Sequence, residues 1–211
     1  MLTTLTLQGR IVTGDALFCQ RTLCTQIRQQ GGEYFFAVKA NQPTLLEDLR
    51  TLFAAPPQDA PMPADLRCGR GHGREELRLL RCSLALVDYS DWPELGYVCT
   101  VQRVVTRHGK TTYEQAYAVT SLTPERITAA GLQTLWRGHW GIENRLHWIR
   151  DETFGEDRCQ VRTGNAPQGL SAVRNTVIGI VRRAGHANVA AALRTYSHHP
   201  RRALALLGIA L

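Results

Sequence analysis

The segment HWGIENRLHWIRDETFGEDR, residues 139–158, concentrates histidine, tryptophan and carboxylate side chains. Within it, a constant interval of four residues separates His139, Glu143, His147 and Asp151. Residues four apart lie on the same side of a helix, so these side chains would line one slowly turning face. That face could hold a zinc or iron ion between its histidines, could carry a carboxylate for catalysis, or could be a solvated flank beside a packed stripe.

A second candidate carboxylate is Asp15, which ends a short apolar stretch. Residues 9–15, GRIVTGD, predict a strand with Asp15 at its carboxyl end. If Glu143 lies on a helix that packs over the same sheet, the two carboxylates could together hold Mg²⁺ ions, which prefer oxygen ligands. Two such ions, roughly 3.5–4 Å apart, stabilise the attacking and the leaving oxygen of a phosphoryl transfer. This pairing is typical of nucleases and transposases.

Basic charge is concentrated toward the end of the sequence. The 211 residues carry a formal net charge of +7. Residues 158–211 contain neither Asp nor Glu, so this segment has a charge of +8 and the remainder a charge of −1. Arginine suits bidentate contacts with phosphate, and nucleic acid is therefore the expected partner. The alternative is that these charges only solvate helix faces. The arginines of the segment are Arg158, Arg162, Arg174, Arg182, Arg183, Arg194, Arg201 and Arg202.

The composition also disfavours other classes of protein. No apolar run approaches the roughly 18 residues that a membrane span needs. The first residues show no basic segment followed by an apolar one, so we expect a cytoplasmic protein. The six cysteines include no Cys-x-x-Cys pair, which disfavours a zinc ribbon and predicts free, buried thiols in a reducing compartment.

The elements expected around Asp15 form an α/β unit. Residues 16–32 predict a helix that stops at a Gly-Gly pair, and residues 34–39 predict a buried strand. A turn at 41–43 then leads into another helix. Residues 1–53 would therefore form a core in which strands and helices alternate.

The middle of the sequence changes in character. Residues 54–70 contain four of the nine prolines and predict a linker. Residues 72–121 alternate between apolar and polar side chains, which predicts three antiparallel strands with a hairpin turn at 108–110. The span 54–121 would thus be a linker and a β-rich insertion.

A long helix is expected to carry Glu143. Thr123 followed by Pro124 predicts its start, and the helical segment would span residues 122–157. Gly138 and a second glycine three residues later would each cost about 1 kcal/mol relative to Ala, which suggests that another group approaches closely. Residues 158–211 predict further helices. The buried stripe of the long helix would consist of Leu132, Leu135, His139, Ile142, Leu146 and Ile149.

Five motifs follow one another along the chain: GRIVTGDALFCQR, GGEYFFAVKANQPTLLEDL, GHGREELR, TSL and HWGIENRLHWIRDETFGEDRCQVRTGNAPQ. In this order they resemble the motifs of bacterial DDE insertion-sequence transposases, in particular the group that includes the H-repeat-associated proteins. The resemblance covers nearly the whole chain, and the last block is its most specific part. It implies an RNase H-like α/β fold with a β-rich insertion and C-terminal helices.

The resemblance also implies roles for single residues. Asp15 and Glu143 match the second catalytic Asp and the catalytic Glu, which would bind Mg²⁺ or Mn²⁺, with two ions in a complete site. A family signature around that Glu is matched by Trp136, His139 and Arg150, of which none is identical to the family residue. We expect these three to contact DNA.

Other matched positions lie outside this signature. Lys39, Asn41 and Arg74 stand in family motifs and are expected either to contact DNA or to support the structure. Within the basic segment we expect DNA contacts from Arg158, Arg162 and Arg174. The partners implied are transposon ends and target DNA, together with further copies of the protein in a homo-oligomer.

One departure from the family pattern concerns the first catalytic Asp. In the family it stands in a DGK-like motif on an earlier strand, and this sequence contains no DGK before or after Asp15. We therefore expect a C-terminal portion of a DDE transposase that lacks the first strands of the sheet and is inactive alone. The alternative is a catalytically dead remnant that binds DNA.

Overall fold

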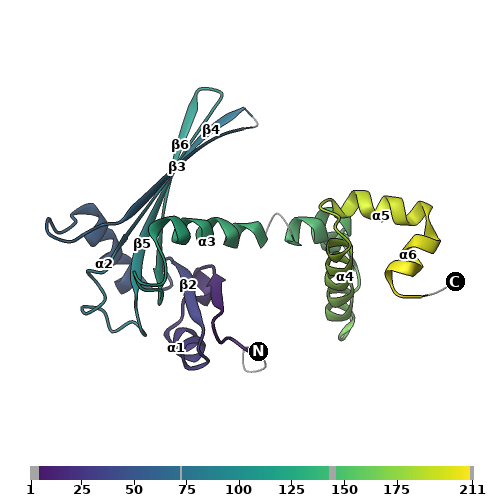
Figure 1. Ribbon diagram of the computed structural model, residues 1–211, viewed down its shortest axis with the longest axis horizontal. Coiled ribbons are helices and arrows are strands. Elements are labelled where there is room, and N and C mark those ends of the chain that lie inside the picture. Colours follow the sequence, from purple (N-terminus) through teal and green to yellow (C-terminus); the bar gives the residue numbers. More distant parts are fainter. Residues whose placement is uncertain (1–4, 72, 143–145, 210–211) are drawn as a thin grey trace. The chain divides into compact units, whose positions relative to one another are not determined.

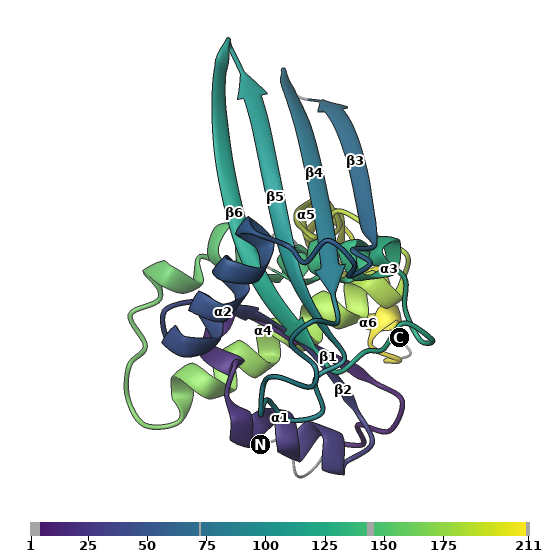
Figure 2. The ribbon, with the colours of Figure 1, turned by 90° about the vertical axis from the view of Figure 1, so that its left-hand side faces the viewer.

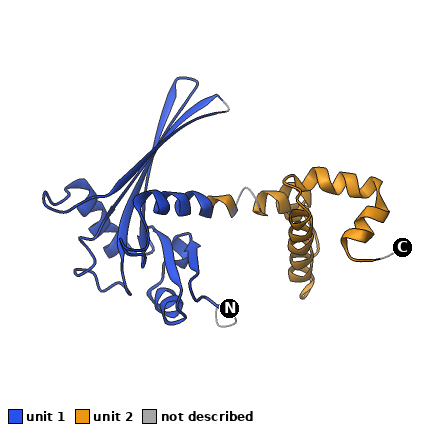
Figure 3. Cartoon of the chain, in the orientation of Figure 1, with its two compact units in different colours: residues 1–139 blue, residues 140–211 orange. Residues whose placement is uncertain are grey.

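The chain forms two compact units. The computed structural model describes residues 5–71, 73–142 and 146–209 (Figure 1). The first unit comprises residues 1–139 and the second residues 140–211 (Figure 3). Each unit has its own hydrophobic core among the described residues.

The described part of the first unit contains a mixed six-stranded sheet in the order β1-β2-β6-β5-β4-β3. β1 and β2 are parallel and every other neighbouring pair is antiparallel. β6 pairs directly with β2, so the strands after residue 63 extend the sheet that β1 and β2 begin. The strands are β1 (Ile11–Gly14), β2 (Glu33–Val38), β3 (Ala64–Gly71), β4 (Arg74–Ser83), β5 (Tyr97–Arg107) and β6 (Lys110–Thr120).

Helices cover the two faces of this sheet near β1 and β2. On one face, called the α2 face, α1 (Arg21–Gln29) and α2 (Pro43–Ala54) pack against Tyr34, Phe36 and Val119. The opposite face, called the α3 face, is covered by α3 (Ala129–Ile142). The far ends of β3, β4, β5 and β6 continue beyond these helices (Figure 2). The core residues of the α3 face are Phe35, Leu80, Cys82, Tyr97, Cys99, Val101, Ala118, Leu122, Ala129 and Leu132.

The described part of the second unit is helical. A π-helical turn, η4 (Ile149–Thr153), is followed by the 3₁₀ turn η5 (Glu156–Arg158) and by α4, α5 and α6. The Asn188 side chain accepts a hydrogen bond from the backbone of Ala191 and so caps α5. The three helices span Ala166–Arg183, Val189–His198 and Pro200–Leu206, and the buried core consists of Ile149, Ile178, Val181, Val189 and Ala192.

Many of the expected elements are confirmed. The chain is a mixed α/β protein, β1 ends directly before Asp15, and α1 stops before the Gly-Gly pair. Residues 108 and 109 form the predicted hairpin turn, both with positive φ. The cysteines are free and four of them are buried as expected, whereas Cys68 is exposed and Cys159 is partly exposed. Burial raises the pKa of Cys24 to about 12. Among the described residues, none of the helices is long and apolar enough to cross a membrane.

Other expectations were wrong. The span 54–70 is not all linker, because β3 begins at Ala64 and pairs with β4. The helix expected at Thr123 starts at Ala129, since residues 124–126 form a turn and the Thr128 hydroxyl accepts from Gly131. α1 also begins later than expected, after the 3₁₀ turn η2 (Ala16–Phe18).

The apolar stripe expected on one long helix is divided between two hydrophobic cores. Leu132 and Leu135 pack on the sheet, whereas Leu146 and Ile149 pack in the second unit. The segment from 146 to 153 is largely π-helical, with a hydrogen bond from Phe154 to Ile149, so the α-helical spacing predicted for residues 139–151 does not continue. Close approach to Gly138 is not seen, since a Cβ there would meet open space.

Candidate active site

Asp15 and Lys39 lie side by side at the carboxyl ends of two parallel strands. Asp15 follows β1 and Lys39 follows β2, and the parallel register of these strands brings their ends together. Lys39 Nζ lies 3.0 Å from Asp15 Oδ1 and donates to Oδ2 at 3.3 Å. The side chains are about half exposed, at 61% for Lys39 and 47% for Asp15. Two residues that the sequence suggested separately therefore form one charged pair.

The turn after β2 fixes the segment that follows Asp15. Asn41 Nδ2 donates to the carbonyl oxygen of Ala16 at 2.6 Å, and Gln42 Nε2 donates to that of Cys19 at 2.9 Å. These hydrogen bonds hold the 3₁₀ turn η2 against the end of β2. Asn41 thus supports the position of Asp15 in this structure.

The carboxyl group of Asp15 is held in its ionised form. A hydrogen bond from the backbone of Ala16 lowers its pKa, and although partial burial opposes this effect, Lys39 and His139 lower the pKa further. Oδ1 is shielded from solvent and accepts no hydrogen bond of good geometry within the described residues, even though the Lys39 ammonium is near. An ionised oxygen with unused acceptor capacity fits the ligand preference of a divalent cation.

α3 brings two of the expected residues to the sheet. His139 Nδ1 lies 3.3 Å from the hydroxyl of Thr13 on β1, two residues before Asp15. One turn earlier, the ring of Trp136 packs edge-on against Phe35 at 5.9 Å between centroids. His139 therefore lies beside the end of β1, whereas Trp136 belongs to the packing of the α3 face.

Glu143, the other carboxylate expected to bind metal, lies outside the described residues. The alternative zinc or iron site would need this residue together with His139 and His147. Within the described ranges, no three side chains of His, Cys, Asp or Glu gather closely enough to hold a metal ion.

The remaining residues expected to bind DNA lie elsewhere. Arg74 begins β4 at the far end of the sheet, away from Asp15. In the second unit, Arg150 and Arg174 both donate to Glu156, which lowers the pKa of that carboxyl. Arg158 and Arg162 are exposed.

A buried charge cluster was not anticipated from the sequence. Glu33, at the start of β2, is only 2% exposed. It forms ion pairs with Arg28 of α1 and Arg126 of the turn before α3, and it accepts a hydrogen bond from the Ser121 hydroxyl. Alternation does not reveal such a residue, because a charged side chain at the end of a strand is typical of a solvated position.

Over most of its length the chain is similar to proteins named as transposases. Residues 1–178 match the family model described as "Transposase DDE domain". Over 190 residues the chain is 34% identical to "Putative protein YbfL" and 33% identical to "H repeat-associated putative transposase YhhI", both of Escherichia coli (strain K12). It is 25% identical over 191 residues to "Putative transposase YncI" of Escherichia coli O157:H7. Each match covers 86% of this chain but only 50%, 50% and 48% of the relative, so the chain spans about half the length of these relatives.

Proposed function

Because this chain belongs to the DDE transposase family, we propose that it takes part in DNA transposition, as a portion of an enzyme that cuts and rejoins DNA phosphodiesters. The proposed catalytic residues are Asp15 and Glu143, with Mg²⁺ or Mn²⁺ as cofactor. The proposed fold is RNase H-like, with β3–β6 as the β-rich insertion. Transposon ends and target DNA are the proposed substrates, and the active assembly is a homo-oligomer.

The observation that carries this proposal is the position of Asp15. The carboxyl ends of parallel strands are where open α/β sheets gather their functional side chains. Asp15 stands at such an end, is ionised, and has His139 of α3 close by. Glu143 follows His139 by four residues in the sequence, which supports pairing it with Asp15.

The chemistry of Asp15 suits a hard cation. Its Oδ1 has acceptor capacity to spare, and its low pKa keeps the oxygen ionised at neutral pH. Asp15 and Glu143 would hold the metal, which would stabilise negative charge on the oxygens of the phosphodiester under attack.

The neighbours of Asp15 have roles of their own in this proposal. Asn41 and Gln42 position the segment after Asp15 through its carbonyl groups. Lys39 keeps the carboxyl ionised and presents a half-exposed ammonium group that can also contact a phosphate. The exposed Arg158 and Arg162 would hold DNA through its backbone.

A second candidate is a DNA-binding protein without catalytic activity. It is favoured by the basic segment 158–211, which carries a charge of +8 without needing any catalytic group. That the 211 residues lack the first catalytic Asp and are inactive alone stays a prediction. The two functions share DNA binding and differ in cleavage.

Cleavage is tested by removing the proposed metal ligand. We expect Glu143→Ala, made in the complete natural protein that contains this chain, to abolish Mn²⁺-dependent nicking of DNA carrying transposon ends. DNA binding in a gel-shift assay should stay the same, because a metal ligand contributes little to backbone contacts.

The matched control is Glu152→Ala, which removes an exposed carboxylate nine residues later. Unchanged nicking by the Glu143 variant would reject the assignment of Glu143. Binding without nicking by the unaltered protein would favour the second candidate.

A further inference from the structure

Three cationic side chains lie directly opposite one another at the far end of the sheet. Arg74 of β4 pairs with Arg107 of β5, and Arg107 pairs with Lys110 of β6. Directly paired residues of antiparallel strands point to the same face. The turn at residues 108 and 109 links the last two strands and fixes this register. Arg74, Arg107 and Lys110 are called the cationic row.

The cationic row lies on the α3 face. Along each strand, alternate residues point to the same face. Lys110 therefore shares a face with Ala118, and Arg74 shares a face with Leu80. Ala118 and Leu80 both belong to the core beneath α3. Arg67 of β3 also lies on this face, because it donates to the carbonyl oxygen of Ala130 in α3 at 2.7 Å.

The cations nearer to α3 are neutralised, whereas the cationic row is not. Arg103 pairs with Glu76 and with Glu114, the latter at 2.9 Å. Arg78 pairs with Glu76 at 2.7 Å. In the described part of the chain, no carboxylate forms an ion pair with any member of the cationic row.

Three adjacent like charges without a counter-ion destabilise a sheet. A binding partner that carries a series of negative charges would relieve this repulsion. Neighbouring strands lie about 4.8 Å apart, so the row spans roughly 10 Å. Long flexible side chains over that span suit a chain of phosphates better than a single small anion.

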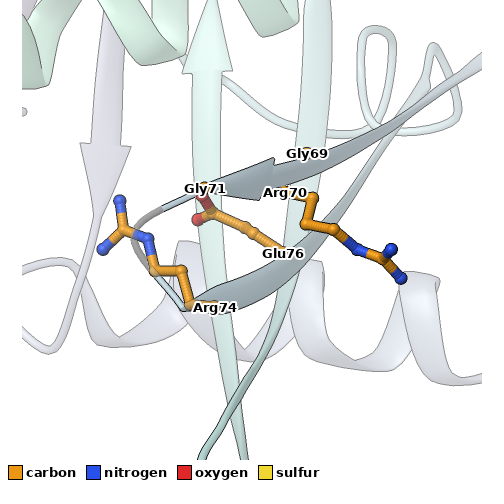
Figure 4. A pocket seen from close by; sticks show the side chains of 5 residues that line it. All are labelled: Gly69, Arg70, Gly71, Arg74 and Glu76. Atoms are coloured by element: carbon orange, nitrogen blue, oxygen red, sulfur yellow. The ribbon is translucent and has the colours of Figure 1, made fainter.

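The surface next to Arg74 is open because two glycines carry no side chain. Gly71 pairs with Arg74 and Gly69 pairs with Glu76, so the glycines continue the same face across β3. A Cβ at either glycine would meet open space. The result is a shallow hollow, in which Arg70 and Arg74 point to opposite sides of the hairpin (Figure 4). A polymer backbone can approach the sheet closely there.

We propose that the cationic row, with the glycine hollow beside it, binds the phosphate backbone of duplex DNA. The choice of DNA as the polyanion rests on the proposed function, whereas the position of the row does not. The contacts would be to phosphates and independent of base sequence, and they would add to those of the arginines in residues 158–211.

The test is the salt dependence of DNA binding by the full chain. Each phosphate contact contributes a slope of about −0.9 to a plot of log K against log salt concentration. We expect Arg107→Gln combined with Lys110→Gln to make this slope shallower by about 1.8. Between about 50 and 200 mM salt, the variant should then lose roughly tenfold less affinity than the unaltered chain.

The matched control is Arg21→Gln combined with Arg50→Gln. It lowers the net charge equally, but Arg21 lies on α1 and Arg50 on α2, and each already pairs with a carboxylate. Its slope should stay within error of the unaltered chain. The variant that exchanges the two residue types, Arg107→Lys with Lys110→Arg, keeps both positive charges and should show the slope of the unaltered chain. This result would distinguish the loss of charge from misfolding of the sheet. Equal slopes for the test and control variants would overturn the proposal.

The remaining outcomes separate this inference from the proposed function. If the row variant binds DNA as the unaltered protein does while the complete protein nicks DNA, the row is rejected and the function stands. If binding depends on the row but no nicking occurs, the row stands and the catalytic proposal fails. If the substitutions in the cationic row weaken the binding of polyglutamate but not that of duplex DNA, the choice of DNA is wrong.

Discussion

At the scale of single residues, the state of the Asp15 carboxyl depends on named neighbours. The backbone of Ala16 and the ammonium of Lys39 both lower its pKa. We expect Lys39→Met to raise this pKa toward the ordinary value of 3.8 without reaching it, because the backbone hydrogen bond remains. Titration of the Asp15 carboxyl by NMR would measure the change, and Lys39→Arg should show little of it.

The pair of Asp15 and Lys39 also predicts how the stability of the folded chain depends on pH. A lowered carboxyl pKa means that the folded chain prefers the ionised form, so the stabilisation is complete above the ordinary pKa of 3.8 and is lost as the pH falls through the folded value. The melting temperatures of Lys39→Met and the unaltered chain should therefore differ at about pH 6, and they should converge as the pH falls below the lowered pKa of Asp15. A difference that does not depend on pH would contradict this account.

The sequence placed some site residues and could not place others. It predicted Asp15 at a strand end, because an apolar run that stops at a carboxylate is a local pattern. It could not pair Asp15 with Lys39, because that contact depends on the parallel register of β1 and β2. It also suggested Arg174 as a DNA contact, whereas Arg174 pairs with Glu156, which precedes the basic segment.

At the scale of elements, the buried Glu33 cluster joins β2, α1 and the turn before α3. We expect Glu33→Gln to lower the free energy of unfolding by about 3 kcal/mol, because removing one member of a buried ion pair leaves its partners without compensation. Urea denaturation at neutral pH would measure this loss. Glu47→Gln, which breaks an exposed pair with Arg50, should cost about 0.5 kcal/mol or less. Equal losses for the two variants would refute the role assigned to Glu33.

Elements with local signals were predicted better than those without. Gly-Gly after α1 and the hairpin turn at 108–109 mark their own positions, because their backbone conformations favour few residue types. β3 was missed because the segment just before Ala64 is rich in proline, which predicts a loop. β3 is also an edge strand that pairs only with β4. The start of α3 was misplaced because Arg126 is held by Glu33, a contact 93 residues away in sequence.

At the scale of the whole molecule, the described cores share no residue between the two units. We expect Ile178→Ala to cost about 2–5 kcal/mol in the second unit. It should speed amide hydrogen exchange in α4 and α5 while leaving β2 and β5 protected. Val98→Ala, in the core of the first unit, should give the reverse pattern. Faster exchange throughout the chain in either variant would mean that the units unfold together.

The paired strands β5 and β6 also restrict how this part of the protein can change in length during evolution. Successive residues of a strand face opposite sides, so deleting one residue from each strand would carry Arg107 and Lys110 to the α2 face. Deleting two from each would shorten the sheet and return both charges to the face they now occupy. Insertions and deletions in this hairpin can therefore preserve the arrangement of charge only in steps of four residues, whatever the residues are.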